Sequence, residues 1–144
     1  MKLRLLLDYH GELAAARQHL GKFPPEFFVQ DSGAVAACIV WLYSHEPLKC
    51  LEVLRPTREF IQTYGYTGPK GYLTGLAQKM AGNGDAARTD WRAALRVVEQ
   101  RLVAQPNAAG LLLNKAVLFA LLGERTEVEP LLREIRQRAK TGER

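Results

Sequence analysis

The sequence predicts an all-α protein, and three observations lead to that prediction. Apolar residues recur at three- and four-residue steps in segment after segment, whereas alternation with a period of two is almost absent. Short turns that carry glycine, histidine or asparagine separate these segments. The turns also recur at a nearly constant spacing. Together, these features indicate amphipathic helices that pack as antiparallel neighbours, with no strand required.

The composition is that of one ordinary globular domain. The chain has 144 residues and a mass of 16.1 kDa, and it is 47% hydrophobic and 24% charged. Its longest apolar stretch, residues 34–43, is far shorter than the ~20 residues that a membrane helix requires. We therefore expect a cytoplasmic protein without a membrane contact. The net charge of +5 is compatible with an acidic partner and identifies none.

Eight helices are expected, arranged as four antiparallel pairs. Their predicted ranges are 2–9, 12–21, 33–43, 46–55, 69–81, 85–104, 108–122 and 127–140, the fourth continuing raggedly past Pro56 to Tyr64. The turns within pairs fall at Gly11, His45, Gly82 and Gly123, which lie 34, 37 and 41 residues apart. Such a period indicates a helical repeat, whose units must stack to bury their apolar faces.

The breaks between pairs divide the chain into units 1–30, 31–67, 68–107 and 108–144. Each break contains residues that stop helices: residues 23–32 with two prolines, residues 65–69, and residues 105–107. Thr126 and Glu129 form a capping-box pattern for the last helix, with Pro130 just inside it.

The last unit carries the clearest motif. Its entry, first helix, turn and second helix contain Pro106, Asn107, Leu112, Ala116, Phe119, Leu122, Gly123, Val128, Leu132 and Ile135. In this spacing it resembles a tetratricopeptide repeat. The preceding unit is similar through Gly75, Ala77, Gly82, Ala87, Trp91 and Ala94. The first half of the chain fits the same frame more loosely.

The resemblance implies a right-handed α-solenoid of about four helix pairs that binds a protein or peptide partner and is not an enzyme. The run of residues 65–71 also looks like repeat regions attached to large bacterial signalling proteins, such as serine/threonine kinases and transcriptional regulators. The first predicted helix is apolar almost all round, with Met1, Leu3, Leu5, Leu6 and Leu7. Another repeat, domain or subunit is expected to cover it, so a homodimer through this helix is one hypothesis.

The family's peptide groove is lined by residues of the first helix of each pair. Carried onto this chain, those positions are Asp8, Tyr9, Val35, Ile39, Leu42, Tyr43, Tyr72, Leu76, Lys79, Leu113, Val117 and Leu121. Such a groove is apolar with tyrosine edges, which favours an apolar or helical ligand over the acidic tails that some family members bind. An equally weighted alternative is that several of these side chains are buried by the curvature of the stack.

Two other functions are weighed against peptide binding. Arg88, Arg92 and Arg96 lie four residues apart on one predicted helix, with Arg101 near that stripe, and such a row can bind phosphates. Asp85, Asp90 and Glu99 interrupt the positive field, so a solvated face is favoured over a nucleic-acid site. A small dedicated chaperone of a secretion system is the other alternative.

No catalytic, metal-binding or cofactor motif is recognised in the sequence. His10 and His45 are interpreted as solvated turn residues, and Trp41 and Trp91 as core anchors. Cys38 and Cys50 fall at the small positions of one helix pair, so we expect two neighbouring, reduced core thiols.

Overall fold

The structure, a computed structural model, describes residues 12–141 and is mainly helical with one small sheet. Its α-helices are α2 (Leu13–Leu20), α3 (Asp31–Tyr43), α4 (Pro47–Leu54), α5 (Lys70–Met80), α6 (Gly84–Ala104), α7 (Ala109–Leu122) and α8 (Arg125–Thr141). The mostly helical class is therefore confirmed. The helix predicted for residues 2–9 lies outside the described residues.

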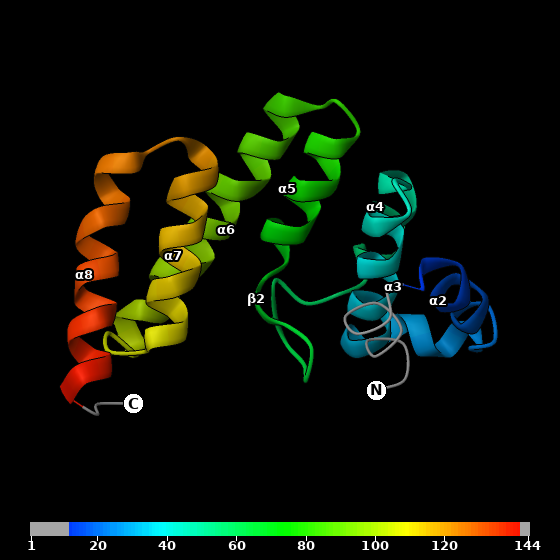
Figure 1. Cartoon of the computed structure of the whole chain (residues 1–144), viewed down its shortest axis with the longest axis horizontal. Helices are drawn as coiled ribbons and strands as arrows, with labels where there is room; N and C mark the ends of the chain where they lie inside the picture. The colour runs from blue at the N-terminus through cyan, green and yellow to red at the C-terminus, as the bar shows by residue number, and fades with distance from the viewer. Residues whose placement is uncertain (1–11, 142–144) are drawn as a thin grey trace.

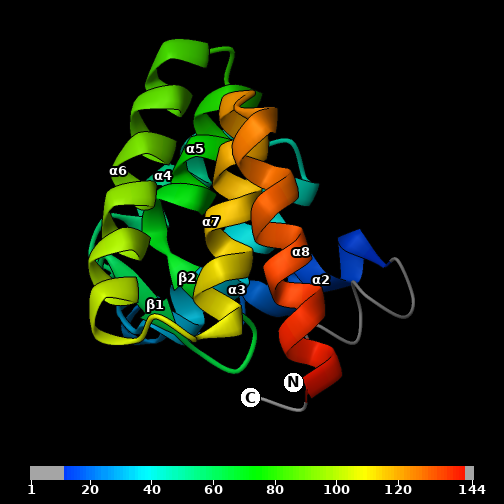
Figure 2. The same cartoon turned by 90° about the vertical axis from the view of Figure 1, so that its left-hand side faces the viewer.

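Helices that follow one another in the chain are also neighbours in space. α3 packs on α4, α5 on α6 and α7 on α8, while α4 and α6 contact the helices that follow them, α5 and α7. Figure 1 shows α5 to α8 standing side by side in chain order, and Figure 2 shows the same group from its end. The architecture thus depends mostly on contacts between segments that are close in sequence.

Two of the predicted turns have the backbone geometry that glycine favours. Gly82 and Gly123 end α5 and α7 with φ values of +84° and +81°. After each glycine the next residue closes a Schellman-type turn: the Asn83 N–H donates to the Gln78 carbonyl and the Glu124 N–H to the Phe119 carbonyl, both at 2.9 Å. The turns at Gly82 and Gly123 are therefore confirmed.

The expected continuation of the fourth helix to Tyr64 is wrong, as is the expectation of a chain without strands. β1 (Phe60–Gln62) and β2 (Thr67–Pro69) pair instead as an antiparallel hairpin. Pro56 lacks an N–H donor and disfavours helical geometry before it, so α4 ends at Leu54. The buried Thr57 hydroxyl then donates to the Leu54 carbonyl at 2.7 Å, which satisfies a carbonyl left free at the helix end.

The break before α3 contains a short 3-10 helix, η1 (Pro25–Val29). α3 itself begins at Asp31, two residues before the predicted start. Gly33 lets the first turn of α3 approach η1, because a Cβ atom at Gly33 would lie 1.9 Å from the Phe27 carbonyl oxygen.

The capping box predicted for the last helix is not formed. α8 already begins at Arg125, so that Thr126 and Pro130 both lie inside the helix. The turn at Gly123 leads directly into α8, and the Glu127 N–H donates to the Glu124 carbonyl at 3.1 Å. The helix start is thus set by the preceding turn and not by a threonine cap.

The core consists of three clusters that follow one another along the chain. The first joins α2 to α3, the second joins α3, α4, the hairpin and α5, and the third joins α5, α6, α7, α8 and the hairpin. Tyr72 packs against both the second and the third cluster, and Trp41 against both the first and the second. Trp91 is 2% exposed, as predicted for a core anchor, whereas Trp41 is only partly buried.

The expectation of reduced thiols is wrong, because the structure joins Cys38 of α3 to Cys50 of α4 in a disulfide. The two cysteines occupy the small positions of facing helices, which brings their Cα atoms to 4.3 Å. Both side chains are fully buried in the second core cluster. The predicted proximity is confirmed, and the bond cross-links the two helices of this pair.

Candidate binding surfaces

The residues of the predicted peptide groove lie on three helices. α3 carries Val35, Ile39, Leu42 and Tyr43, α5 carries Tyr72, Leu76 and Lys79, and α7 carries Leu113, Val117 and Leu121. Tyr72, Leu76 and Leu121 all pack against the third core cluster, so α5 and α7 bring these three together. Asp8 and Tyr9 lie outside the described residues.

Part of this set belongs to the interior. Val35 is only 2% exposed and packs in the second core cluster, so its assignment to a groove surface is wrong. Tyr72 is partly buried, and the centroid of its ring lies 6.1 Å from that of the stacked Tyr66 ring. Leu76 is partly buried against the third core cluster. The contacts between successive helix pairs account for this burial, because they use the same faces that the repeat frame assigns to a ligand.

Lys79 of α5 is exposed, and the exposed apolar members of the set lie on α3 and α7. Tyr43, at the end of α3, is 62% exposed, and on α7 Leu113 and Val117 are 52% and 37% exposed. Gly110 and Ala120 are also exposed and fall on the same face of α7, since the four positions follow a three-four-three spacing. These four residues, Gly110, Leu113, Val117 and Ala120, form what we call the α7 stripe. It contains no charged or hydrogen-bonding side chain.

The predicted basic face is not one continuous surface. Arg88, Arg92, Arg96 and Arg101 are all exposed on α6. Arg92 pairs with Glu124 at 3.1 Å, whereas Arg101 lies over the Phe60 ring of the hairpin, 3.9 Å from its centroid. Placing Arg101 near the stripe of the other three was therefore wrong, because thirteen residues after Arg88 a helix has turned most of the way to its opposite side.

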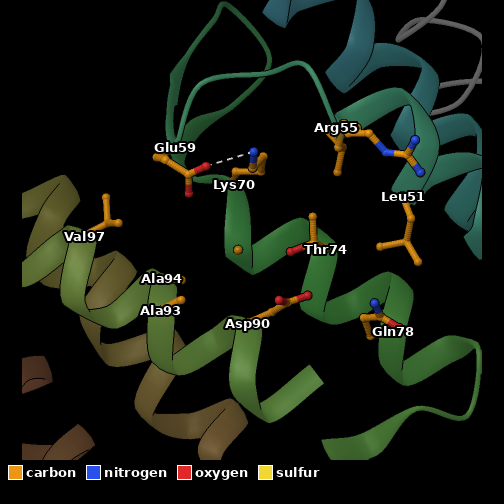
Figure 3. Close-up of a pocket in the computed structure, with 12 residues that line it drawn as sticks. Leu51, Arg55, Glu59, Lys70, Thr74, Gln78, Asp90, Ala93, Ala94 and Val97 are labelled. Carbon is orange, nitrogen blue, oxygen red and sulfur yellow. Dashed lines mark ion pairs between the residues drawn. The ribbon is translucent and has the colours of Figure 1, made fainter. Parts of the chain in front are cut away.

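A cleft of about 530 Å³ lies between α4 and α6, with α5 as its floor (Figure 3). We call it the α4–α6 cleft. Leu51 comes from α4 and Arg55 directly follows it, while Thr74 and Gln78 come from α5 and Asp90 and Ala93 from α6. Gly71 allows α5 and α6 to approach here, since a Cβ atom at Gly71 would lie 2.6 Å from the Asp90 carbonyl oxygen. This surface was not predicted from the sequence.

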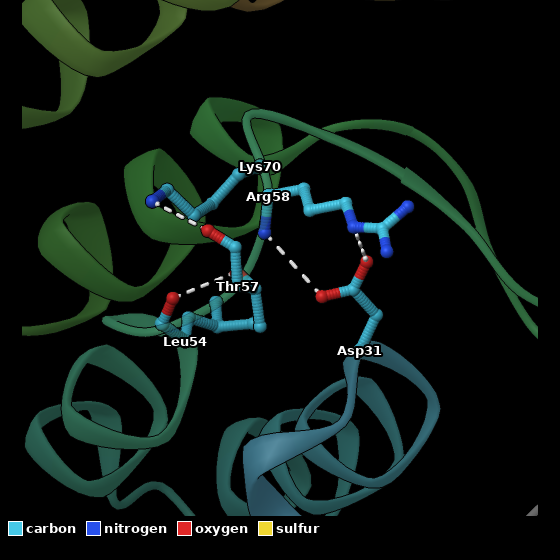
Figure 4. Close-up of polar contacts among 5 residues, drawn as sticks. All are labelled: Asp31, Leu54, Thr57, Arg58 and Lys70. Atoms are coloured by element: carbon cyan, nitrogen blue, oxygen red, sulfur yellow. Dashed lines mark hydrogen bonds and ion pairs between the residues drawn. The ribbon is translucent and has the colours of Figure 1, made fainter.

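Polar contacts hold the hairpin at the edge of the α4–α6 cleft. The Lys70 ammonium group pairs with Glu59 at 2.9 Å and donates to the Thr57 carbonyl at 3.2 Å. On the other side of the same segment, Asp31 accepts the Arg58 N–H at 3.3 Å, and its second oxygen lies 3.8 Å from the Arg58 Nε (Figure 4). The segment between α4 and β1 is therefore anchored to both α3 and α5.

A second charged group surrounds Trp41. The Lys49 ammonium lies 4.6 Å and the Arg17 guanidinium 5.7 Å from the ring centroid, and both cations pair with Glu46. The hydrogen bond from Lys49 and the two positive charges hold the pKa of Glu46 below its usual range, against an opposing effect of desolvation. Since the carboxylate offsets the cations, this arrangement ties α2 to the turn before α4.

The histidines and acidic residues of the described part of the chain are the remaining groups that could hold a metal ion. His45 is exposed in its turn with a φ of 56°, as expected, while His10 lies outside the described residues. Within residues 12–141, no three His, Cys, Asp or Glu side chains are grouped so that they could hold a metal ion. None of the helices in this range has the length and apolar character needed to cross a membrane.

Comparison with known proteins adds no assignment. No protein-family model, no curated protein and no solved structure matches this chain. The function must therefore be argued from the surfaces described above.

Proposed function

We propose that this protein is a non-catalytic interaction module whose α7 stripe binds an apolar face of a protein or peptide partner. The observation that carries the proposal is the exposure of Leu113 and Val117, one helical turn apart, on a face without charged groups. Fully burying an exposed leucine or valine side chain contributes roughly 1.5–3 kcal/mol, and Leu113 and Val117, at 52% and 37% exposed, can contribute about half of that before the costs of association are subtracted.

The proposal includes a stack of helix pairs in the style of tetratricopeptide repeats. The pairing of α3 with α4, α5 with α6 and α7 with α8 supports it, as do the left-handed glycines that close two of these pairs. The hairpin between α4 and α5 departs from the repeat pattern. In such a stack the first helices of the pairs share one face, on which Tyr43 and the α7 stripe supply exposed apolar side chains.

Replacing Leu113 and Val117 together with glutamine tests the proposal. Both positions are exposed, and glutamine is a good helix former, so the variant should fold. Partners captured by the wild-type chain at high salt should be lost from the variant, because salt screens charges and leaves apolar contacts intact. Light scattering of the same two proteins shows whether the partner is a second copy of the chain.

The matched control is the double variant Arg88→Gln and Arg96→Gln, which changes two exposed side chains on α6. It should retain every partner that the stripe variant loses. Loss of binding in this control, with retention in the stripe variant, would instead favour the basic face and an anionic partner such as nucleic acid. Equal binding by all three proteins would exclude both surfaces.

A further inference from the structure

Asp90 of α6 is an isolated carboxylate. Its four neighbours on the same helix face, at three and four residues before and after it, are all alanines: Ala86, Ala87, Ala93 and Ala94. No hydrogen bond or ion pair involves its side chain within the described residues. A carboxylate that is partly buried gains stability from a cation, and none of residues 12–141 supplies one.

The Asp90 side chain belongs to the α4–α6 cleft. It extends from α6 toward α5, where Thr74 and Gln78 line the same hollow (Figure 3). The lysine of the lining, Lys70, is already engaged by Glu59 and by the Thr57 carbonyl at the hairpin end. The acidic group in the middle of the cleft therefore remains available to a ligand.

The opposite wall carries the complementary charge. Arg55, the residue that follows α4, is exposed at the rim of the cleft, where its side chain extends along α4 and away from Asp90 (Figure 3), and no acidic side chain of the described residues pairs with it. Between the two charges the walls carry small or apolar side chains: Leu51 on α4, and Ala93 and Val97 on α6. A ligand that fits both walls carries a positive group toward α6 and a negative group toward α4.

The dimensions favour a peptide segment. A volume of about 530 Å³ falls in the range of ligand sites, about 300–1,000 Å³. The cleft is open along one side, however, and does not surround a small ligand. From Asp90 to Val97 the α6 wall runs about 10 Å, at roughly 1.5 Å per helical residue, which matches about three residues of an extended chain. Successive side chains of such a chain point to opposite sides and thus toward opposite walls.

We propose that the α4–α6 cleft binds an extended peptide segment of a partner protein that places a lysine or arginine side chain against Asp90 and an acidic side chain toward Arg55. The alkyl stem of the basic residue lies along Ala93 on the α6 wall, while its charged head reaches the carboxylate and the Thr74 hydroxyl. This surface is separate from the α7 stripe and does not depend on it.

Selection of a displayed library of random linear heptapeptides on the full-length chain tests the inference. Enriched peptides should contain a lysine or arginine, and replacing that residue with glutamine should weaken binding at least tenfold. Asp90→Asn should weaken binding by a similar factor, since it removes the charge and preserves the shape of the side chain. Because the wild-type carboxylate has no partner to lose, this variant should fold normally, which circular dichroism can check.

The matched control is Asp85→Asn, which removes the same charge from an exposed position at the start of the same helix. Its affinity for the selected peptides should equal that of the wild type, and so should that of the Leu113 and Val117 double variant. The inference is overturned if no peptide is enriched, if the enriched peptides lack a basic residue, or if Asp90→Asn binds as well as the wild type. Loss of binding only in the α7 stripe variant would support the proposed function and exclude the cleft.

Discussion

Gly75 of α5 and Trp91 of α6 lie in direct contact across the helix pair: a Cβ atom at Gly75 would stand 2.2 Å from the Trp91 Nε1. The indole is almost fully buried, and its N–H donates to the Tyr72 carbonyl at 3.4 Å. The absence of a side chain on α5 is thus what allows the largest residue of α6 to enter the core.

Gly75→Ala should therefore destabilise the protein, although alanine is the better helix former. Inserting a methyl group into a filled core typically costs about 1–3 kcal/mol, which exceeds the gain in helix propensity. Gly110→Ala is the control, since a Cβ atom at Gly110 in α7 meets nothing within 4 Å. Urea unfolding should show a lower free energy of unfolding than wild type for Gly75→Ala and no decrease for Gly110→Ala. Equal stability of the two would contradict the close packing.

The disulfide between Cys38 and Cys50 gives a second prediction. Cross-links that close loops of about 15 residues stabilise folded proteins by roughly 3 kcal/mol, and these cysteines are 12 residues apart. Reduction should lower the free energy of unfolding by about 2–3 kcal/mol in wild type. It should have no effect on the Cys38→Ala and Cys50→Ala double variant.

Intact-mass analysis tests the bond directly. Since both cysteine side chains are buried, alkylation must be carried out in denaturant, where a bonded pair takes up no label before reduction and two labels after it. Two labels without a reductant would show that the pair is reduced in the purified protein.

Most of the helices could be predicted from sequence because their signals are local. The predicted range 85–104 nearly coincides with α6, Gly84–Ala104, and the predicted range 108–122 with α7, Ala109–Leu122. Turn glycines such as Gly123 mark positions where the chain must adopt a positive φ, which few other residues tolerate. These features require no knowledge of the rest of the fold.

The hairpin could not be predicted in the same way. β1 has only three residues, and the first two of them, Phe60 and Ile61, are both buried, so the strand shows no alternating pattern. β2 contains Gly68 and Pro69, which are depleted in strands. The hairpin is formed by contacts with α5, α6 and α7, among them a hydrogen bond from the Asn114 amide to the Thr67 carbonyl at 3.3 Å.

The candidate surfaces also combine features that the sequence predicts with features that depend on tertiary packing. The resemblance to a tetratricopeptide repeat assigned Leu113, Val117 and Val35 alike to a groove; the first two are exposed, but the burial of Val35 depends on how α3, α4 and α5 pack. Asp90 did carry a sequence signal, a carboxylate with alanine at every neighbouring position of its helix face. That signal becomes informative only when α4 is known to lie opposite.

Asp31 provides a third prediction, concerning the anchor of the hairpin. In Asp31→Ala the Arg58 N–H loses its acceptor, and the segment before β1 should open more often. We expect the free energy of unfolding to fall by about 1 kcal/mol and hydrogen exchange at the Arg58 amide to become faster. Asp31→Asn keeps an acceptor oxygen and should retain the slow exchange, although it also loses the favourable negative charge in the first turn of α3. Equally fast exchange in both variants would show that the charge, and not the hydrogen bond, anchors the segment.

Tyr66 gives the last prediction, a dependence of stability on alkaline pH. Its hydroxyl donates to the Pro69 carbonyl at 2.7 Å, and burial, with a smaller contribution from Tyr72, raises its pKa well above the ordinary value of 10.0. Below pH 10 the phenol is neutral in both the folded and the unfolded chain, so its contribution to stability is constant. Above pH 10 only the unfolded chain ionises freely, and stability should fall by up to about 1.4 kcal/mol per pH unit.

Tyr66→Phe isolates this effect from other alkaline titrations. The variant loses the hydrogen bond to Pro69 and should be less stable at neutral pH by about 1 kcal/mol. It has no phenol to ionise at this position, so its stability should decline less steeply between pH 10 and pH 12 than that of the wild type. Chemical denaturation at several pH values measures both slopes. Parallel curves would mean that Tyr66 ionises as easily in the folded protein as in the unfolded chain, which its partly buried hydrogen bond opposes.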